Sequence, residues 1–155
     1  YKSVVSEIRY GSAESKKIGK HALDEYARRL MGIGWGPIVF SIDKVEQQHK
    51  ALQPDLGNYF RLIYRIFKYL AGHDSDSDFY ADMFRAQLTS AELHLLFFNC
   101  LTQVGNPMKD YAERFELFDN MPVPNGENFA ILAQQFEPSC FGTNADLLKL
   151  VSTDN

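Results

Sequence analysis

The chain contains few of the residues on which metal and redox chemistry depend. It has two cysteines, Cys100 and Cys140, and four histidines. The cysteines form no C-x-x-C pair and the histidines form no H-x-x-x-H or H-E-x-x-H spacing, so neither a disulfide framework nor a zinc site is expected. We predict reduced thiols, with Cys100 as a core residue, and no metal or other cofactor.

Long apolar runs and catalytic motifs are equally scarce. No apolar run approaches the ~20 residues that span a bilayer, and no signal peptide is visible, so a cytoplasmic location is predicted. The Gly-x-Gly run at 32–36 lacks the Lys-Ser/Thr ending of a phosphate loop, and no G-x-S-x-G turn occurs. The pattern argues against an enzyme. The chain starts at Tyr1 rather than Met, which predicts a fragment of a longer protein whose upstream part could hold a membrane anchor.

The residues that are abundant favour a helical core. Of the 155 residues, 45% are hydrophobic and 14% aromatic, and the net charge of −4 gives no whole-domain basic field for nucleic acid. Apolar residues recur three and four apart, and strand-like alternation is never sustained. Six helices are predicted at 15–31, 37–53, 55–71, 78–88, 90–104 and 107–118, followed by shorter helical pieces at 129–136 and 145–151. Residues 1–155 are therefore predicted to be a single all-α domain, a bundle of about six to seven helices.

Local signals predict how these helices begin, end and face. Pro37 suits a first helical turn, and Gln53-Pro54 is expected to end that helix. In the 78–88 helix, Phe79, Met83 and Phe84 are predicted to face inward. Thr89 and Glu92 form a capping box. The 90–104 helix that follows is the most apolar segment and is predicted to be central.

Polar residues in the two most apolar helices predict a buried network. Glu92, Asn99 and Gln103 share one narrow stripe of the 90–104 helix, and buried polar groups need partners. Arg61, Arg65 or Arg85 is predicted to bind the Glu92 carboxylate, because a guanidinium can donate two hydrogen bonds to it. The alternative is that Arg61, Arg65, Lys68 and Arg85 line a surface for phosphate, RNA or an acidic partner, with Tyr64 and Tyr69 near it.

Two further patterns lead to no catalytic prediction. Asp74, Asp76 and Asp78 alternate as at the start of a calcium loop, but Phe79 and Arg85 occupy its glycine and glutamate slots, so loop and helix-cap roles are predicted. Helical ribonucleases of the HEPN type have an Arg closely followed by a His. His73 and His94 lie too far from Arg65 and Arg85 for that motif.

Two segments resemble the phage abortive infection (AbiC-like) family of bacteria. Residues 58–68 (NYFRLIYRIFK) are similar to the family's Tyr-Phe-Arg-x-x-Tyr-x-x-x-Lys helix. Residues 80–99 (YADMFRAQLTSAELHLLFFN) are similar to its Arg-Ala-Gln-Leu-Ser/Thr-Ser-x-Glu run leading to Phe-x-Asn. Residues 19–24 and Phe141-Gly142 fit weaker flanking positions. The matching positions are Tyr59, Phe60, Arg61, Tyr64, Arg85, Gln87, Glu92 and Asn99.

The resemblance implies a bacterial or phage-encoded antiviral defence protein, often with transmembrane helices ahead of this domain. We predict a helical sensor or effector module that acts through contacts with a protein partner or a second copy of itself. The alternative is a nuclease-like defence effector that binds RNA through a basic stripe. The residues predicted to form the binding or structural polar network are Arg61, Tyr64, Arg65, Arg85, Gln87, Glu92 and Asn99.

Overall fold

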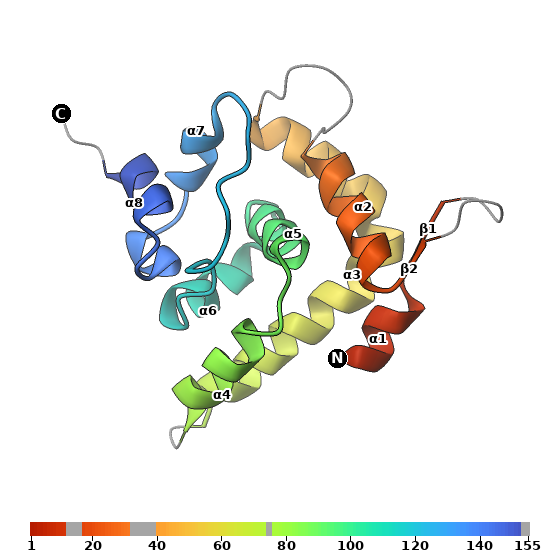
Figure 1. Ribbon diagram of the computed structural model, residues 1–155, viewed down its shortest axis with the longest axis horizontal. Coiled ribbons are helices and arrows are strands. Elements are labelled where there is room, and N and C mark those ends of the chain that lie inside the picture. The colour runs from red at the N-terminus through yellow and green to blue at the C-terminus, as the bar shows by residue number, and fades with distance from the viewer. Residues whose placement is uncertain (12–16, 32–39, 74–75, 153–155) are drawn as a thin grey trace.

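Helices make up 67% of the computed structural model, and the strands among its described residues form only a two-stranded antiparallel ribbon, so the all-α prediction is confirmed (Figure 1). The structure describes residues 1–11, 17–31, 40–73 and 76–152. The elements in chain order are α1 Lys2–Glu7, β1 Arg9–Tyr10, β2 Lys17–Ile18, α2 Lys20–Leu30, α3 Ile42–Ala71, α4 Ser77–Arg85, α5 Ser90–Cys100, the 3-10 helix η1 Asn106–Met108, α6 Lys109–Arg114, α7 Phe129–Ala133, the 3-10 helix η2 Pro138–Phe141 and α8 Ala145–Val151.

The α3 helix is the longest element and corrects the prediction of two helices at 37–53 and 55–71. It runs unbroken for 30 residues with Pro54 inside it. Pro54 lies on the exposed side, while Leu52 and Leu56 on either side of it are buried. Because the buried stripe continues past the proline, packing outweighs the lost backbone hydrogen bond. The helix begins after Ser41, whose hydroxyl caps the amide of Lys44, and the predicted start at Pro37 lies outside the described residues.

The α5 helix is central, as predicted. Every residue from Glu92 to Cys100 is buried, and α2 and α3 both pack on it (Figure 1). It ends at Cys100 rather than at the predicted 104. The Thr102 hydroxyl donates to the Asn99 carbonyl at 2.7 Å and accepts from the Gly105 amide at 3.1 Å, so a side chain replaces the helical hydrogen bonds there.

The C-terminal part of the chain packs on α5 through aromatic rings. Phe97 of α5 stacks on Phe136 with ring centroids 4.5 Å apart and meets Phe118 edge-on at 5.4 Å. The predicted 107–118 helix corresponds to η1 and α6, and it ends early, at Arg114, because the chain turns there and Glu116 adopts a positive φ of 48°. The 129–136 helix is shorter than predicted, and α8 matches its prediction.

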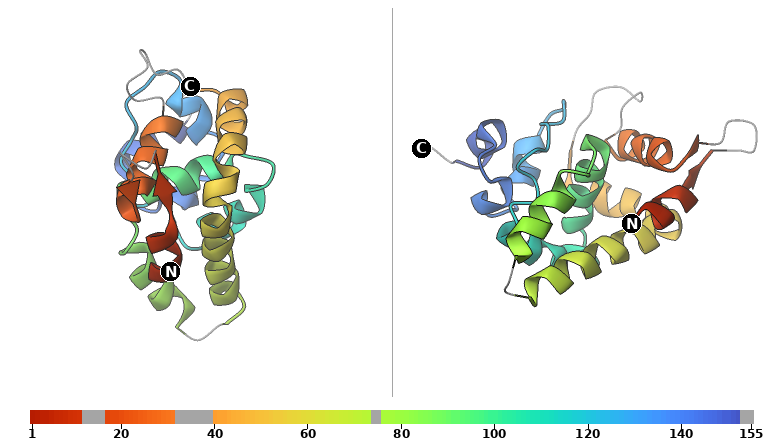
Figure 2. Two further views of the ribbon diagram at one scale, coloured as in Figure 1. Left: turned by 90° about the vertical axis from the view of Figure 1, so that its right-hand side faces the viewer. Right: turned by 60° about the horizontal axis from the view of Figure 1, so that its bottom comes forward.

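The α4 helix and the N-terminal segments show further differences. Phe79 and Met83, predicted to face inward, are 61% and 52% exposed, whereas Ala81 is buried and only Phe84 packs inward, against Phe67. The reason is that α4 runs alongside the end of α3 and covers it with one narrow face (Figure 2). The α1 helix and the ribbon had no sequence signal, and α2 starts at Lys20 rather than at 15 because Gly19 precedes it with a positive φ.

Candidate functional site

The Glu92 carboxylate is fully buried at the start of α5 and closes the predicted capping box. Its Oε2 accepts from the backbone amide of Thr89 at 2.9 Å and from the Thr89 hydroxyl at 3.0 Å. The Thr89 hydroxyl in turn accepts from the Glu92 amide at 3.3 Å. The two side chains together therefore satisfy two free amide donors at the start of the helix, and Glu92 places a negative charge at its positive end.

The other partners of Glu92 come from α3, from α2 and from the residue that precedes α1. Its Oε1 accepts from the Tyr59 hydroxyl of α3 at 3.2 Å and from the hydroxyl of Tyr1, which precedes α1. Lys20, the first residue of α2, places its Nζ 3.3 Å from Oε2 and also donates to the Gln87 carbonyl at 2.9 Å. Burial, followed by the charge of Glu92, raises the pKa of Tyr59 well above its ordinary value, so this phenol stays a donor.

The predicted pairing of an arginine with Glu92 is wrong. The cation is Lys20, the first residue of α2. Residues 19–24 fit the family pattern only weakly, and that was the one signal that could have pointed to Lys20. Arg61 is exposed and donates to the Asn58 side chain, and Arg65 is exposed on the same face of α3. A lysine on a flexible stem can reach a buried acid from a helix end, which periodicity does not reveal.

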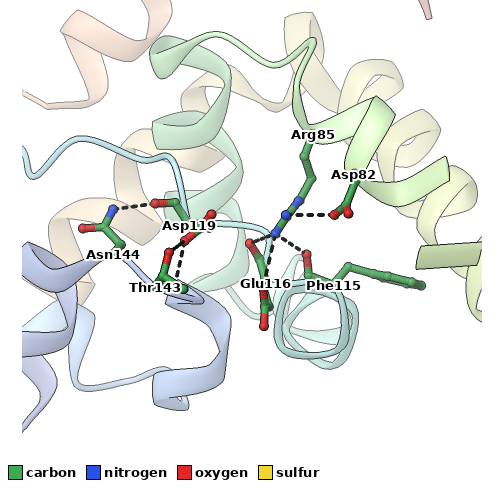
Figure 3. Close-up of polar contacts among 7 residues, drawn as sticks. All are labelled: Asp82, Arg85, Phe115, Glu116, Asp119, Thr143 and Asn144. Carbon is green, nitrogen blue, oxygen red and sulfur yellow. Dashed lines mark hydrogen bonds and ion pairs between the residues drawn. The ribbon is translucent and has the colours of Figure 1, made fainter. Parts of the chain in front are cut away.

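Arg85 has a different role, at the contact between α4 and the turn after α6 (Figure 3). Its guanidinium donates to the Phe115 carbonyl at 2.8 Å and to the Glu116 carbonyl, and it pairs with Asp82 one turn earlier at 2.9 Å. The turn is then tied to the start of α8, because Asp119 accepts from the Thr143 amide at 2.8 Å. Arg85 therefore fixes α4 in place. Gln87 follows it, exposed, with its side chain on the Met83 carbonyl.

Three of the predicted site residues, Arg61, Tyr64 and Asn99, line one cavity of about 320 Å³ between α3 and the turn from α5 to η1. Asn99 is buried, and its Oδ1 lies 2.8 Å from Nε2 of His49 on α3. Its stripe neighbour Gln103 is exposed. The structure thus divides the predicted network into the Glu92 cluster, the Arg85 contact and this cavity.

Three basic side chains do form an exposed stripe on α3: Arg61, Arg65 and Lys68. Among the residues that the structure describes, none of the three forms an ion pair with an acid. Lys68 places its Nζ 5.9 Å from the ring centre of Tyr64. Arg85, which the alternative prediction added to this surface, is held at the α6 turn instead.

The remaining nucleophilic and titratable candidates are buried or packed on neighbours. Cys100 and Cys140 are buried free thiols, and burial raises the pKa of both. His94 is buried with Nε2 2.8 Å from the Pro122 carbonyl, and the exposed His73 packs on the Tyr69 ring. Within the described ranges, no three His, Cys, Asp or Glu side chains gather where they could hold a metal ion.

The buried histidines predict how stability depends on pH. Burial lowers the pKa of His49 and of His94 below the value of about 6.5 for an exposed histidine. The unfolded chain therefore binds more protons than the folded chain as the pH falls through about 6.5, and the free energy of unfolding decreases. The melting temperature should drop between about pH 7 and about pH 5.5.

Replacing either buried histidine by glutamine should reduce this slope, and His73→Gln, at an exposed position, should leave it unchanged. Thermal denaturation at several pH values measures the effect. Equal slopes for the parent chain, His49→Gln and His94→Gln would contradict the assignment.

The structure is an all-α domain. Its buried Glu92 carboxylate, the contact of Arg85 with the turn after α6, and the cavity beside Asn99 all lie in one half of the sequence. Residues 51–126, which contain all three except the N-terminal partners of Glu92, match the family described as putative phage abortive infection protein. The predicted resemblance is therefore confirmed. No curated protein and no solved structure matches the chain. Among the described residues, no helix is both long and apolar enough to cross a membrane.

Proposed function

We propose that this domain is a phage-defence module that acts as a sensor or effector by docking a protein through the outer face of α4. The family match supports the defence role. The observation that carries the docking is that Phe79, Tyr80 and Met83 of α4 are 61%, 54% and 52% exposed. Aromatic residues and methionine are enriched at protein interfaces, and a cluster of them on one short helix is unusual for a surface without a partner.

The position of α4 strengthens this proposal. Arg85 in its last turn donates to two backbone carbonyls after α6, so the helix is held against the fold rather than loosely attached. Phe79 and Tyr80 also contact each other edge-on, with ring centroids 5.6 Å apart. A rigid apolar face loses little conformational entropy on binding, which favours a specific protein contact.

The test is phage plating on bacteria that express the full-length gene. A combined Phe79→Ser, Tyr80→Ser and Met83→Ser variant should remain folded, because these side chains are exposed, yet lose most of the reduction in plaque number. Ile131→Ser is the matched control, since Ile131 is also 52% exposed but lies on α7, away from the α4 face. Full protection by the folded α4 variant would exclude this surface as the docking site. No protection by the parent gene against any phage would exclude the defence role.

A second candidate function is RNA binding through the α3 stripe, as in the nuclease-like alternative. The supporting observation is that Arg61, Arg65 and Lys68 are exposed together beside Tyr64. In this case affinity for RNA should fall steeply with salt, and Arg61→Gln and Arg65→Gln should weaken binding by similar amounts. Binding that is absent at low salt would eliminate it.

A further inference from the structure

The cavity between α3 and the α5–η1 turn has the size and lining of a small-molecule site. Its volume of about 320 Å³ lies at the lower end of the range of ligand pockets. Phe60, Tyr64 and Met108 supply apolar and aromatic walls. All lining residues fall within 51–126, the region that matches the family.

Two glycines keep this cavity open. A Cβ at Gly105 would lie 2.5 Å from Nδ2 of Asn99, so only glycine leaves room over that carboxamide. A Cβ at Gly57 would lie 3.2 Å from Nε2 of Gln53 and 3.3 Å from Nη1 of Arg61. The missing side chain at Gly57 therefore leaves a gap between an amide and a guanidinium, both of which line the cavity.

The polar groups of the lining are two carboxamides and one cation. The hydrogen bond between Asn99 and His49 fixes the orientation of the Asn99 carboxamide. Oε1 of Gln53 is buried and has no hydrogen-bond partner among the residues that the structure describes, so it is an acceptor that a ligand donor can satisfy. Arg61 also lines the cavity and is exposed, and within the described ranges its side chain donates a hydrogen bond only to the neutral Asn58 side chain.

Aromatic walls, two carboxamides and a guanidinium together fit one class of ligand. Oδ1 of Asn99 already faces His49, so Asn99 offers its Nδ2 as a donor, and Gln53 offers Oε1 as an acceptor. A donor and an acceptor together match the edge of a nucleobase, adenine above all. Aromatic side chains stack on bases, and arginine binds phosphate through a planar pair of donors. We propose that the cavity binds a nucleotide, with its base between Tyr64 and the two carboxamides and its phosphate at Arg61. This proposal does not depend on the docking role of α4.

Isothermal titration calorimetry of the full chain with AMP, GMP, CMP and UMP tests the site. At least one monophosphate should bind with one-to-one stoichiometry. Arg61→Gln should weaken it by about tenfold or more, as expected when a charge-assisted phosphate contact is lost. Arg65→Gln is the matched control, because Arg65 is exposed one turn along α3 but does not line the cavity. Its affinity should stay within about twofold of the parent.

The Gly57→Ala variant distinguishes a loss of nucleotide binding from a loss of stability. The new methyl group meets only the ends of two flexible side chains, and alanine favours a helix more than glycine, so the melting temperature should rise. Nucleotide affinity should nevertheless fall, because the methyl group occupies the gap between Gln53 and Arg61.

A short single-stranded oligoribonucleotide, titrated in parallel, identifies the source of the nucleotide. Tighter binding of the oligomer assigns the site to a nucleotide within a strand, and equal or weaker binding assigns it to a free nucleotide. The proposal is overturned if none of the four monophosphates binds at millimolar concentration, or if Arg61→Gln and Arg65→Gln weaken binding equally.

Discussion

Glu92→Ala should lower the free energy of unfolding by about 3–5 kcal/mol, because it leaves the buried Tyr59 hydroxyl and the partly buried donors around it without an acceptor. The hydroxyls of Tyr59 and Tyr1, the Thr89 amide and the Lys20 ammonium all direct a donor at this carboxylate. The loss of the helix cap adds to the effect. Denaturant unfolding measures it. Asp146→Ala removes an acid whose pair with Lys149 is almost fully exposed, and it should cost less than about 0.5 kcal/mol.

A double-mutant cycle identifies the cation that interacts with the Glu92 carboxylate. Glu92 should couple with Lys20 when each is replaced singly and together, and it should show no coupling with Arg85, which contacts Asp82 and the α6 turn instead. Coupling to Arg85, or a Glu92→Ala variant as stable as the parent chain, would refute the arrangement.

Gly105→Ala should be comparably destabilising for a steric reason. A Cβ at this position would lie 1.9 Å from the Asn99 carbonyl oxygen and 2.5 Å from its carbonyl carbon, both backbone atoms of α5. The end of the helix would have to move, at the point where Asn99 contacts His49. We expect a loss of about 3 kcal/mol or more, or failure to fold.

Gly72→Ala is the control for this prediction. Gly72 follows α3, and its nearest atoms would be ordinary van der Waals neighbours at 3.6 Å and 3.7 Å. Circular dichroism melting curves should show a large decrease for Gly105→Ala and a change within about 1 kcal/mol for Gly72→Ala. Equal effects would show that the backbone at Gly105 relaxes freely.

The parts of the fold that could be predicted are those decided by local pattern. The central helix, its capping box and α8 follow from periodicity and cap residues that lie within a few positions of each other. Pro54 misled the prediction because the local cost of a proline was visible, whereas the burial on both sides that outweighs it was not. The outward face of α4 was missed for the same reason, since apolar periodicity shows that a face exists but not whether anything covers it.

The burial of Glu92 and Asn99 could be predicted, but the residues that bind them could not. Glu92 and Asn99 are buried polar residues, as the pattern indicated, and Arg61 lies near Asn99 at the cavity. The partner of Glu92 was wrong because Lys20 and Tyr1 lie far from it in sequence, and no spacing rule connects them. Arg85 was predicted to bind a carboxylate in the core, but its main contacts are backbone carbonyls. Every residue has a backbone carbonyl, so no sequence pattern reveals such a partner.

The spread of the Glu92 partners also determines how much of the chain must be present for the family region to fold. Tyr1 is 91 residues away from Glu92, and Lys20 lies outside 51–126. A fragment limited to the matched residues would keep Thr89 and Tyr59 but would expose the carboxylate and the face of α5 that α2 covers. We therefore expect the matched region not to fold on its own in this protein, because α2 packs on α5 as part of the same core.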